Sequence, residues 1–333
     1  MNTQEFPLPW PAIKARLSSE TIGWIAFCVM VLSSGTYYSF AKVLSSTLSP
    51  FTVVLLSESL TATFVLLSFG LFPAIRSFLR LSSEKRLALL GVGLASGICA
   101  PAMLFSGLRI TSAVNATLFG DTEPLFLLIL AVLLLHEKLR WHHILAKLLI
   151  IMGIACIALR GFSEGFVFHP GDAFLILAGL FYGFGDLLFR KYLHNVHTST
   201  VILGRSTIAI SGALTLSLLL PSIGTFAEAR ALPLQLLGVL IGFAFISRFL
   251  NLFSFYQSLE RLPVGTLSVF SNLNVISSMI FARLYLGETI QGYQIVGGMF
   301  IIGGAVLLEL LGGHHRSRTQ HIAHLKQRQA YRV

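Results

Sequence analysis

Long apolar stretches without a charged residue are the feature that most constrains this chain. Examples run from Thr21 to Ala41, from Leu87 to Leu108 and from Leu262 to Ala282. A bilayer core about 30 Å thick is spanned by a helix of roughly 20 such residues. Apolar residues make up 55% of the 333 and charged residues only 11%, too few to cover a water-soluble domain. We therefore expect an integral membrane protein.

The apolar stretches are long and continuous, whereas a transmembrane β-barrel shows segments of about ten residues with alternating character. This favours helices, and the expected fold is an all-α membrane protein with ten transmembrane helices. The predicted spans cover residues 22–41, 51–71, 87–108, 112–135, 142–160, 172–190, 200–220, 234–257, 264–286 and 290–311.

The distribution of Lys and Arg over the loops predicts the orientation. With the N-terminus inside, sixteen fall on the inner side and four on the outer side, which places both termini in the cytoplasm. We expect residues 1–21 to be a cytoplasmic segment and residues 312–333 to be a basic, His-rich cytoplasmic tail that contacts anionic lipid. This topology accounts for the positive charge without a nucleic-acid partner. The expected location is the inner (cytoplasmic) membrane of the cell.

The two halves of the chain are related by a constant shift. Glu137 and Glu288 are 151 residues apart, and the same shift aligns Leu108–Leu159 with Leu259–Leu310 without a gap. Each half, residues 22–160 and residues 171–311, has five predicted spans. Because five is odd, the second half enters the membrane in the opposite sense, which predicts inverted-topology repeats. This architecture is typical of secondary transporters that work by alternating access.

The stretch from Leu108 to Ala113, then Glu123-Pro124, then Leu135 to Leu139, resembles the EamA-type repeat of the drug/metabolite transporter (DMT) superfamily. The second copy, with Leu259 to Val264 and Leu286 to Ile290, is similar to it. The resemblance implies ten helices, cytoplasmic termini and a central cavity lined by the first four helices of each half.

Four ionisable residues lie deep within predicted spans, namely Glu58, Asp121, Glu123 and Arg248. Burying a charge there is costly, so each needs a partner, a watery cavity or neutralisation. Three acids face one base, which predicts either a site for a cationic solute or an acid that carries a proton, and Glu123, Glu58 and Asp121 are the proton-coupling candidates. Asp121 and Glu123 are two residues apart, so only one of them can point squarely into a cavity.

Other charged residues have local interpretations. Lys147 and Arg205 lie about two turns or less from inner helix ends and are expected to reach the membrane surface with their heads. Asp186 precedes Arg190 by four residues, which favours a local ion pair.

Further polar residues are candidates for the cavity lining. Asn251 shares a helix face with Arg248, and Asn272 and Asn274 are the repeat mates of Asp121 and Glu123. An amide suits recognition of polar solute groups, and hydrogen bonds between helices are the structural alternative. Tyr38 and Tyr182 offer cation–π recognition of an amine, or simple packing.

These patterns favour a secondary transporter, and more specifically an exporter of an amino acid or amine-bearing metabolite, with protons as a possible coupling ion. The alternative substrate is a nucleotide-sugar-like or other anionic metabolite exchanged through Arg248. An intramembrane enzyme is the alternative from another class, but the sequence shows no His-Glu-x-x-His motif, no paired aspartates with Gly and no Gly-rich phosphate loop. No cofactor or metal is expected, and a homodimer is compatible with the pattern.

Overall fold

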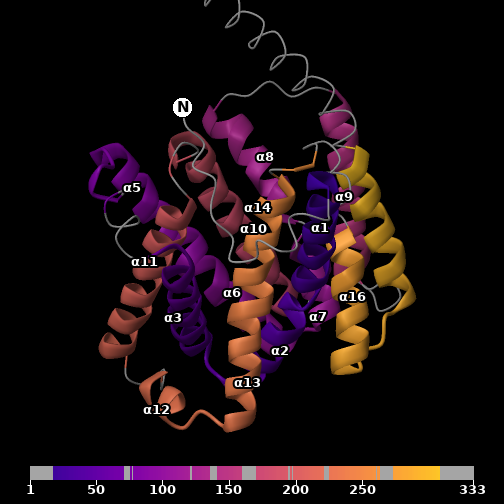
Figure 1. The fold of residues 1–333 in the computed structure, drawn as a ribbon. Helices are drawn as coiled ribbons and strands as arrows, with labels where there is room; N and C mark the ends of the chain where they lie inside the picture. The colour runs from indigo at the N-terminus through magenta and orange to yellow at the C-terminus, as the bar shows by residue number, and fades with distance from the viewer. Residues whose placement is uncertain are drawn as a thin grey trace, which may run out of the picture.

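The computed structural model is all helical over the residues that it describes (Figure 1). Those residues are 18–70, 76, 78–120, 122–135, 141–159, 170–193, 196, 198–220, 225–259, 261–262 and 273–307. Seven of the described helices are long and apolar enough to cross a membrane, and three further apolar helices are shorter. The all-α membrane prediction is confirmed, whereas the number of ten spans and their orientation stay predictions.

The first half begins with two helices that follow each other across Thr36. Its elements are α1 (Ser19–Gly35), α2 (Tyr37–Thr47), α3 (Pro50–Phe69), α5 (Ser83–Val92), the π-helical η1 (Gly93–Cys99), α6 (Ala100–Ile110), α7 (Ala113–Gly120), α8 (Thr122–Leu135) and α9 (Trp141–Ala158). The Thr36 hydroxyl donates to the Ser33 carbonyl at 2.7 Å, so a side chain satisfies one backbone group beside the break.

The second half has a similar, though not identical, order of helices. They are α10 (Pro170–Leu188), η3 (Phe189–Leu193), α11 (Thr198–Leu219), α12 (Thr225–Arg230), α13 (Leu234–Gly242), the π-helical η5 (Phe243–Leu250), α14 (Asn251–Leu259), α16 (Leu273–Leu286) and an unlabelled last helix (Gly292–Leu307). In Figure 1 the helix α12 lies at one end of the bundle and the start of α5 at the other.

Two π-helical stretches occupy equivalent positions in the halves. Adding 151 to the bounds of η1, residues 93 and 99, gives 244 and 250, which fall within η5. The same shift pairs Ser96 with Ser247 and Gly97 with Arg248. Because π-helical segments inside α-helices are frequent at functional sites, η1 and η5 are candidates for part of a functional site.

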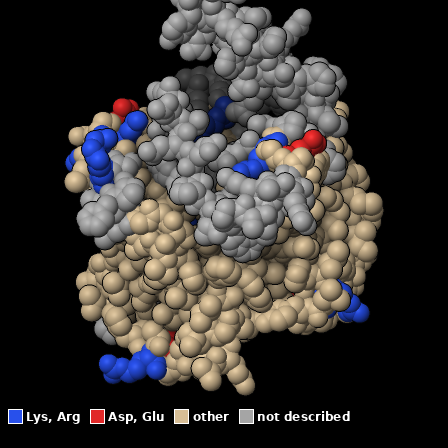
Figure 2. Space-filling view, viewed as in Figure 1, with Lys and Arg blue, Asp and Glu red and all other residues tan. Residues whose placement is uncertain are grey.

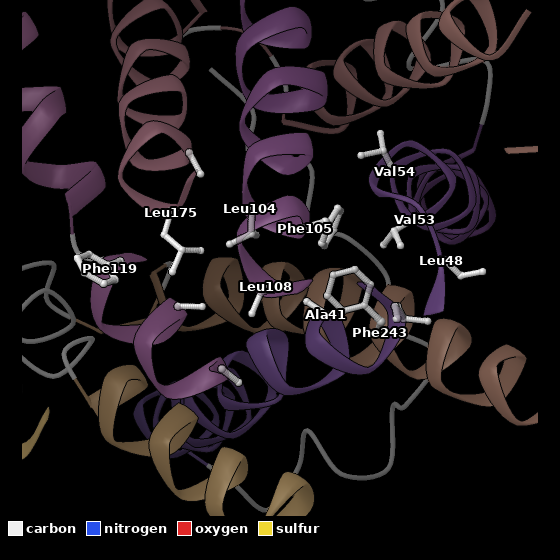
Figure 3. Packing of buried hydrophobic residues seen from close by; sticks show 14 of the residues in the cluster. Ala41, Leu48, Val53, Val54, Leu104, Phe105, Leu108, Phe119, Leu175 and Phe243 are labelled. Carbon is white, nitrogen blue, oxygen red and sulfur yellow. The ribbon is translucent and has the colours of Figure 1, made fainter. Parts of the chain in front are cut away.

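The buried core joins the two halves. Phe105 and Leu108 of the first half pack in one cluster with Leu175 and Phe243 of the second half, and Figure 3 shows these side chains converging. In a bilayer the lipid is as apolar as the core, so close packing rather than removal of surface from water stabilises such a contact.

Glycines permit a close contact between α10 and α8. A Cβ added at Gly183 would lie 2.8 Å from the Leu127 nitrogen and 3.0 Å from the Glu123 carbonyl oxygen. One added at Gly179 would lie 2.0 Å from the Thr122 hydroxyl. The pair of glycines spaced by four residues thus lets two backbones approach, as small residues do in membrane proteins.

The molecular surface has an apolar middle. Figure 2 shows the Lys, Arg, Asp and Glu side chains of the described residues gathered toward the two ends, with a broad uncharged band between them. Large apolar side chains are exposed on this chain, including Leu67 and Leu284, each 79% exposed. Such a surface fits a belt of lipid chains rather than water.

Candidate solute-binding cavity

A central cavity of about 400 Å3 lies between the two halves. A second cavity of about 350 Å3 adjoins it and shares Tyr37, Tyr38, Gly120, Glu123, Ser247 and Asn251 with it. The first is lined by Tyr37, Tyr38, Thr61, Ser96, Leu104, Ala116, Gly120, Glu123, Leu175, Ala178, Gly179, Tyr182, Asp186, Ile202, Arg205, Ser247, Arg248, Asn251 and Leu252. This size is within the range of small-molecule sites.

Glu58 of α3 lies behind the cavity wall and is held by three donors. Its side chain is 1% exposed. The Ser206 hydroxyl donates to Oε2 at 2.6 Å, Arg248 pairs with Oε1, and Nη2 of Arg205 lies 3.4 Å from the same oxygen. A carboxylate fixed by two guanidinium groups is stabilised in its charged form.

Arg248 of η5 connects this ion cluster to the cavity. Its side chain is 12% exposed, and Nη1 donates to the Ser57 hydroxyl at 3.2 Å while Nη2 faces Glu58. The guanidinium carbon also lies 5.9 Å from the centre of the Phe243 ring. Arg248 therefore lines the cavity with its charge already matched by a protein acid.

Arg205 of α11 is placed differently from the sequence expectation. It turns inward to the cavity and to Glu58, so the prediction that its head reaches the membrane surface was wrong. The reason is the neighbouring Gly97 of η1, where an added Cβ would lie 3.3 Å from Cγ of Arg205. The missing side chain at position 97 leaves room for the arginine stem. The side chain of Lys147 lies outside the described residues.

Glu123 and Asp186 meet in the cavity from opposite halves. Glu123 is on α8 and Asp186 on α10, the two helices that the glycines bring together, and both side chains line the cavity. Sequence reasoning assigned Asp186 to a local pair with Arg190, so it missed this cavity position. The signal was present in the sequence, because Gly179, Tyr182 and Asp186 are spaced three and four residues apart and share a helix face.

The predicted asparagines form hydrogen bonds between helices. Asn251 donates to the Met30 carbonyl at 2.9 Å, and the Ser34 hydroxyl donates to Oδ1 of Asn274 at 2.7 Å. Asn251 lines both cavities and Asn274 the second one. Both residues thus serve the packing of α1 and retain a polar face toward the cavities. Asp121 and Asn272 lie outside the described residues.

Tyrosines make up the aromatic part of the wall. The rings of Tyr37 and Tyr38 meet edge to face, with centroids 5.3 Å apart, and Tyr182 lines the same cavity. A Cβ added at Gly120 would lie 2.0 Å from the Tyr38 hydroxyl oxygen. Gly120 therefore leaves the space that positions the Tyr38 hydroxyl at the end of α7.

The comparisons with known proteins match both halves of the chain separately. The profile of the EamA-like transporter family matches residues 21–159 and again residues 169–310. The chain belongs to the EamA-like transporter family. It is therefore a multi-pass membrane protein of a transporter family within the drug/metabolite transporter superfamily.

The similar EamA proteins are themselves described as uncharacterized transporters. One from Synechocystis sp. is 26% identical over 214 residues, which cover 62% of this chain and 61% of that protein. One from Methanothermobacter thermautotrophicus is 26% identical over 232 residues, 69% of this chain and 66% of that protein. The chain thus matches slightly less than two thirds of the length of these two relatives. A solved crystal structure superposes with a TM-score of 0.57 and 18% identity over 88% of this chain and 96% of that one, which supports the fold alone.

Polar contacts tie the halves of this EamA-like transporter together at the end that carries α12. The Glu288 carboxylate accepts from the backbone N–H of Ala113 at 2.8 Å and of Val114 at 3.0 Å, so a residue of the second half caps the start of α7. Nε2 of Gln294 donates to Oδ1 of Asn115 at 2.6 Å, and Nδ2 of Asn115 lies 3.3 Å from Asp172. These contacts link the two halves at this end of the bundle.

Proposed function

We propose that this chain exports a small amine-bearing metabolite, such as an amino acid, across the cytoplasmic membrane in exchange for protons. The supporting observation is the cavity of about 400 Å3 between two related halves of a transporter-family protein. A site at the interface of two repeats can be exposed to one side and then to the other when the halves rock. Both termini are placed in the cytoplasm on the basis of loop charge.

The wall of the cavity favours an amine. Glu123 and Asp186 offer carboxyl oxygens, and Tyr37, Tyr38 and Tyr182 surround the same space with aromatic rings. Carboxylates and ring faces are the two kinds of group that recognise an ammonium. By contrast, the charge of Arg248 is matched by Glu58, so exchange of an anionic metabolite through Arg248 has less support. Membership in a transporter family likewise favours transport over intramembrane catalysis.

The proton carrier of the proposed exchange is the Glu123 and Asp186 pair. Two carboxyl groups that line one cavity from facing helices would repel each other if both were ionised, so the pair is suited to holding one proton. Two carboxyl groups that share one proton are a known way of avoiding adjacent like charges. Glu58 is a poor carrier by comparison, because two arginines and Ser206 hold it. A solute ammonium that enters between Glu123 and Asp186 would displace the proton, which couples the two movements.

The test is transport in proteoliposomes that contain the purified full-length protein. Labelled amino acids and amines are followed with and without a pH gradient, and also as exchange between compartments of equal pH. We expect the gradient to drive accumulation in the wild type. Asp186→Asn should abolish that accumulation and keep the equal-pH exchange, whereas Glu84→Gln, an exposed acid in the first turn of α5, should change neither. Full pH-driven accumulation by both Asp186→Asn and Glu123→Gln would refute the assigned carrier.

A further inference from the structure

Three helices meet at one corner of the central cavity. Ser96 of η1 packs against α10, since a Cβ added at Gly185 would lie 1.9 Å from the Ser96 hydroxyl oxygen. Arg205 of α11 packs against the next residue of η1, Gly97. Asp186 follows Gly185 in α10, and all three side chains, Ser96, Arg205 and Asp186, line the cavity. We call this group of residues the Ser96 corner.

Two polar atoms of the Ser96 corner lack a partner. Among the described residues, neither the Ser96 hydroxyl nor Nε of Arg205 makes a hydrogen bond, although both atoms are buried. The Ser96 side chain is only 6% exposed. An unsatisfied buried polar group costs about 1–3 kcal/mol, and native structures rarely keep two together without a bound group to satisfy them.

The donors and charges around the corner indicate what that group is. One carboxylate, Glu58, faces both Arg205 and Arg248, so two positive charges meet one negative charge behind the wall. Glu123 and Asp186 balance these charges across the cavity, so the two unpaired donors themselves, a hydroxyl and a guanidinium N–H, indicate the group: they suit an anion with at least two oxygens. A carboxylate has that shape and charge.

We propose that the Ser96 corner binds the carboxylate of the transported solute, with Arg205 and Ser96 as its hydrogen-bond donors. The inference rests on the proposed transport function, in which Glu123 and Asp186 take the ammonium of the same solute. An α-amino acid carries both groups on one carbon atom, so one corner can hold both. The corner therefore selects the head group of an α-amino acid over a simple amine.

The rest of the cavity determines which side chain such a solute carries. Away from the corner the wall includes the apolar side chains of Leu104, Leu175, Ala178 and Leu252. An apolar side chain of moderate size satisfies this wall, because burying it there needs no further hydrogen bond. Leucine is thus a suitable probe, with leucinamide and isopentylamine as analogues that lack the carboxylate.

The experiment measures binding of these three probes to the purified full-length protein by titration calorimetry. We expect the wild type to bind leucine about tenfold more tightly than leucinamide or isopentylamine, the size of one charge-assisted hydrogen bond. Ser96→Ala should reduce this preference about tenfold. The matched control is Ser217→Ala in α11, a buried serine that does not line the cavity; its hydroxyl already donates to the Ala213 carbonyl at 2.7 Å, so its loss should leave the preference unchanged.

A second variant distinguishes a loss of carboxylate binding from a general loss of folding. Arg205→Lys keeps the positive charge beside Glu58 but has no Nε–H, so it should also lower the preference for leucine over leucinamide, with an unchanged elution profile of the protein. Equal binding of leucine and leucinamide by the wild type, or an unaltered preference in both variants, would overturn the proposal. Efflux of amines from proteoliposomes without any preference for leucine would leave transport standing and refute the corner. Selective leucine binding without efflux would confirm the corner and refute the transport function.

Discussion

Removing the charge of Glu58 should destabilise the whole bundle. The side chains of Glu58 and Arg248 are 1% and 12% exposed, so Glu58→Gln leaves a buried guanidinium without its counterion. Breaking a buried pair in this way costs about 3–5 kcal/mol. The pair of Arg205 with Glu58 contributes less to the free energy of unfolding, because Arg205 is 24% exposed and its Nη2 lies 3.4 Å from the carboxylate. Gln can still accept from Ser206, so we expect the free energy of unfolding to fall by about 3 kcal/mol, at the lower end of that range.

The assay is reversible unfolding of the purified protein in mixed micelles, with increasing amounts of a denaturing detergent. Glu84→Gln, at an exposed position of α5, is the control for the loss of one acid. The double variant Glu58→Gln, Arg248→Met removes the unpaired charge as well, and it should be more stable than Glu58→Gln alone by about 1 kcal/mol or more. A Glu58→Gln protein within about 1 kcal/mol of the wild type would show that the ion cluster does not hold α3, α11 and η5 together.

Three further predictions concern packing, capping and topology. Gly120→Ala would place Cβ 2.0 Å from the Tyr38 hydroxyl oxygen and displace that side chain, so the affinity for an amine should fall about fivefold in calorimetry. The control is Gly292→Ala, where the added Cβ has no atom within 4 Å and the affinity should not change. Glu288→Ala removes the acceptor at the start of α7 and should lower the free energy of unfolding by about 1–2 kcal/mol in the same detergent assay, with a smaller loss for Glu288→Gln. For topology, single cysteines are introduced into a variant without native Cys. Cysteines at residues 161–171 should be labelled from outside the cell, and cysteines after residue 313 should be labelled only once the membrane is permeabilised. Labelling of the tail from outside would contradict the inverted topology.

The helices were predictable from sequence because bilayer thickness sets the length of an apolar run. The approach of α8 and α10 depends on Gly179 and Gly183, but two glycines four residues apart indicate a close helix contact without showing which helix is the partner. Arg205 was not predictable from its own helix, because a long side chain two turns from a helix end can reach either the membrane surface or the interior. What decides is Gly97, a residue that lies more than a hundred positions away in the chain and leaves space at that height.

The polar residues of the cavity were likewise predictable from the sequence only in part. Counting charges along the chain indicated Glu123 and Arg248, which the structure places in the cavity wall. It also indicated three acids against one base, an imbalance that changes once Arg205 and Asp186 are included. The described cavity and the wall behind it hold Glu58, Glu123 and Asp186 against Arg205 and Arg248. Such a balance depends on which helices touch, and no single helix carries that information.

The matching π-helical stretches η1 and η5 also carry a record of ancestry. The stretches stand at equivalent positions in two halves that match one family profile, which is consistent with their descent from a single repeated unit. The residues within them diverged afterwards, since position 97 is glycine in one copy and its mate is Arg248 in the other. An ancestor built from two identical units would have carried the same residue at both places. The buried Arg248 of η5 and the gap at Gly97 that admits Arg205 thus make the two halves contribute unequally to one cavity wall.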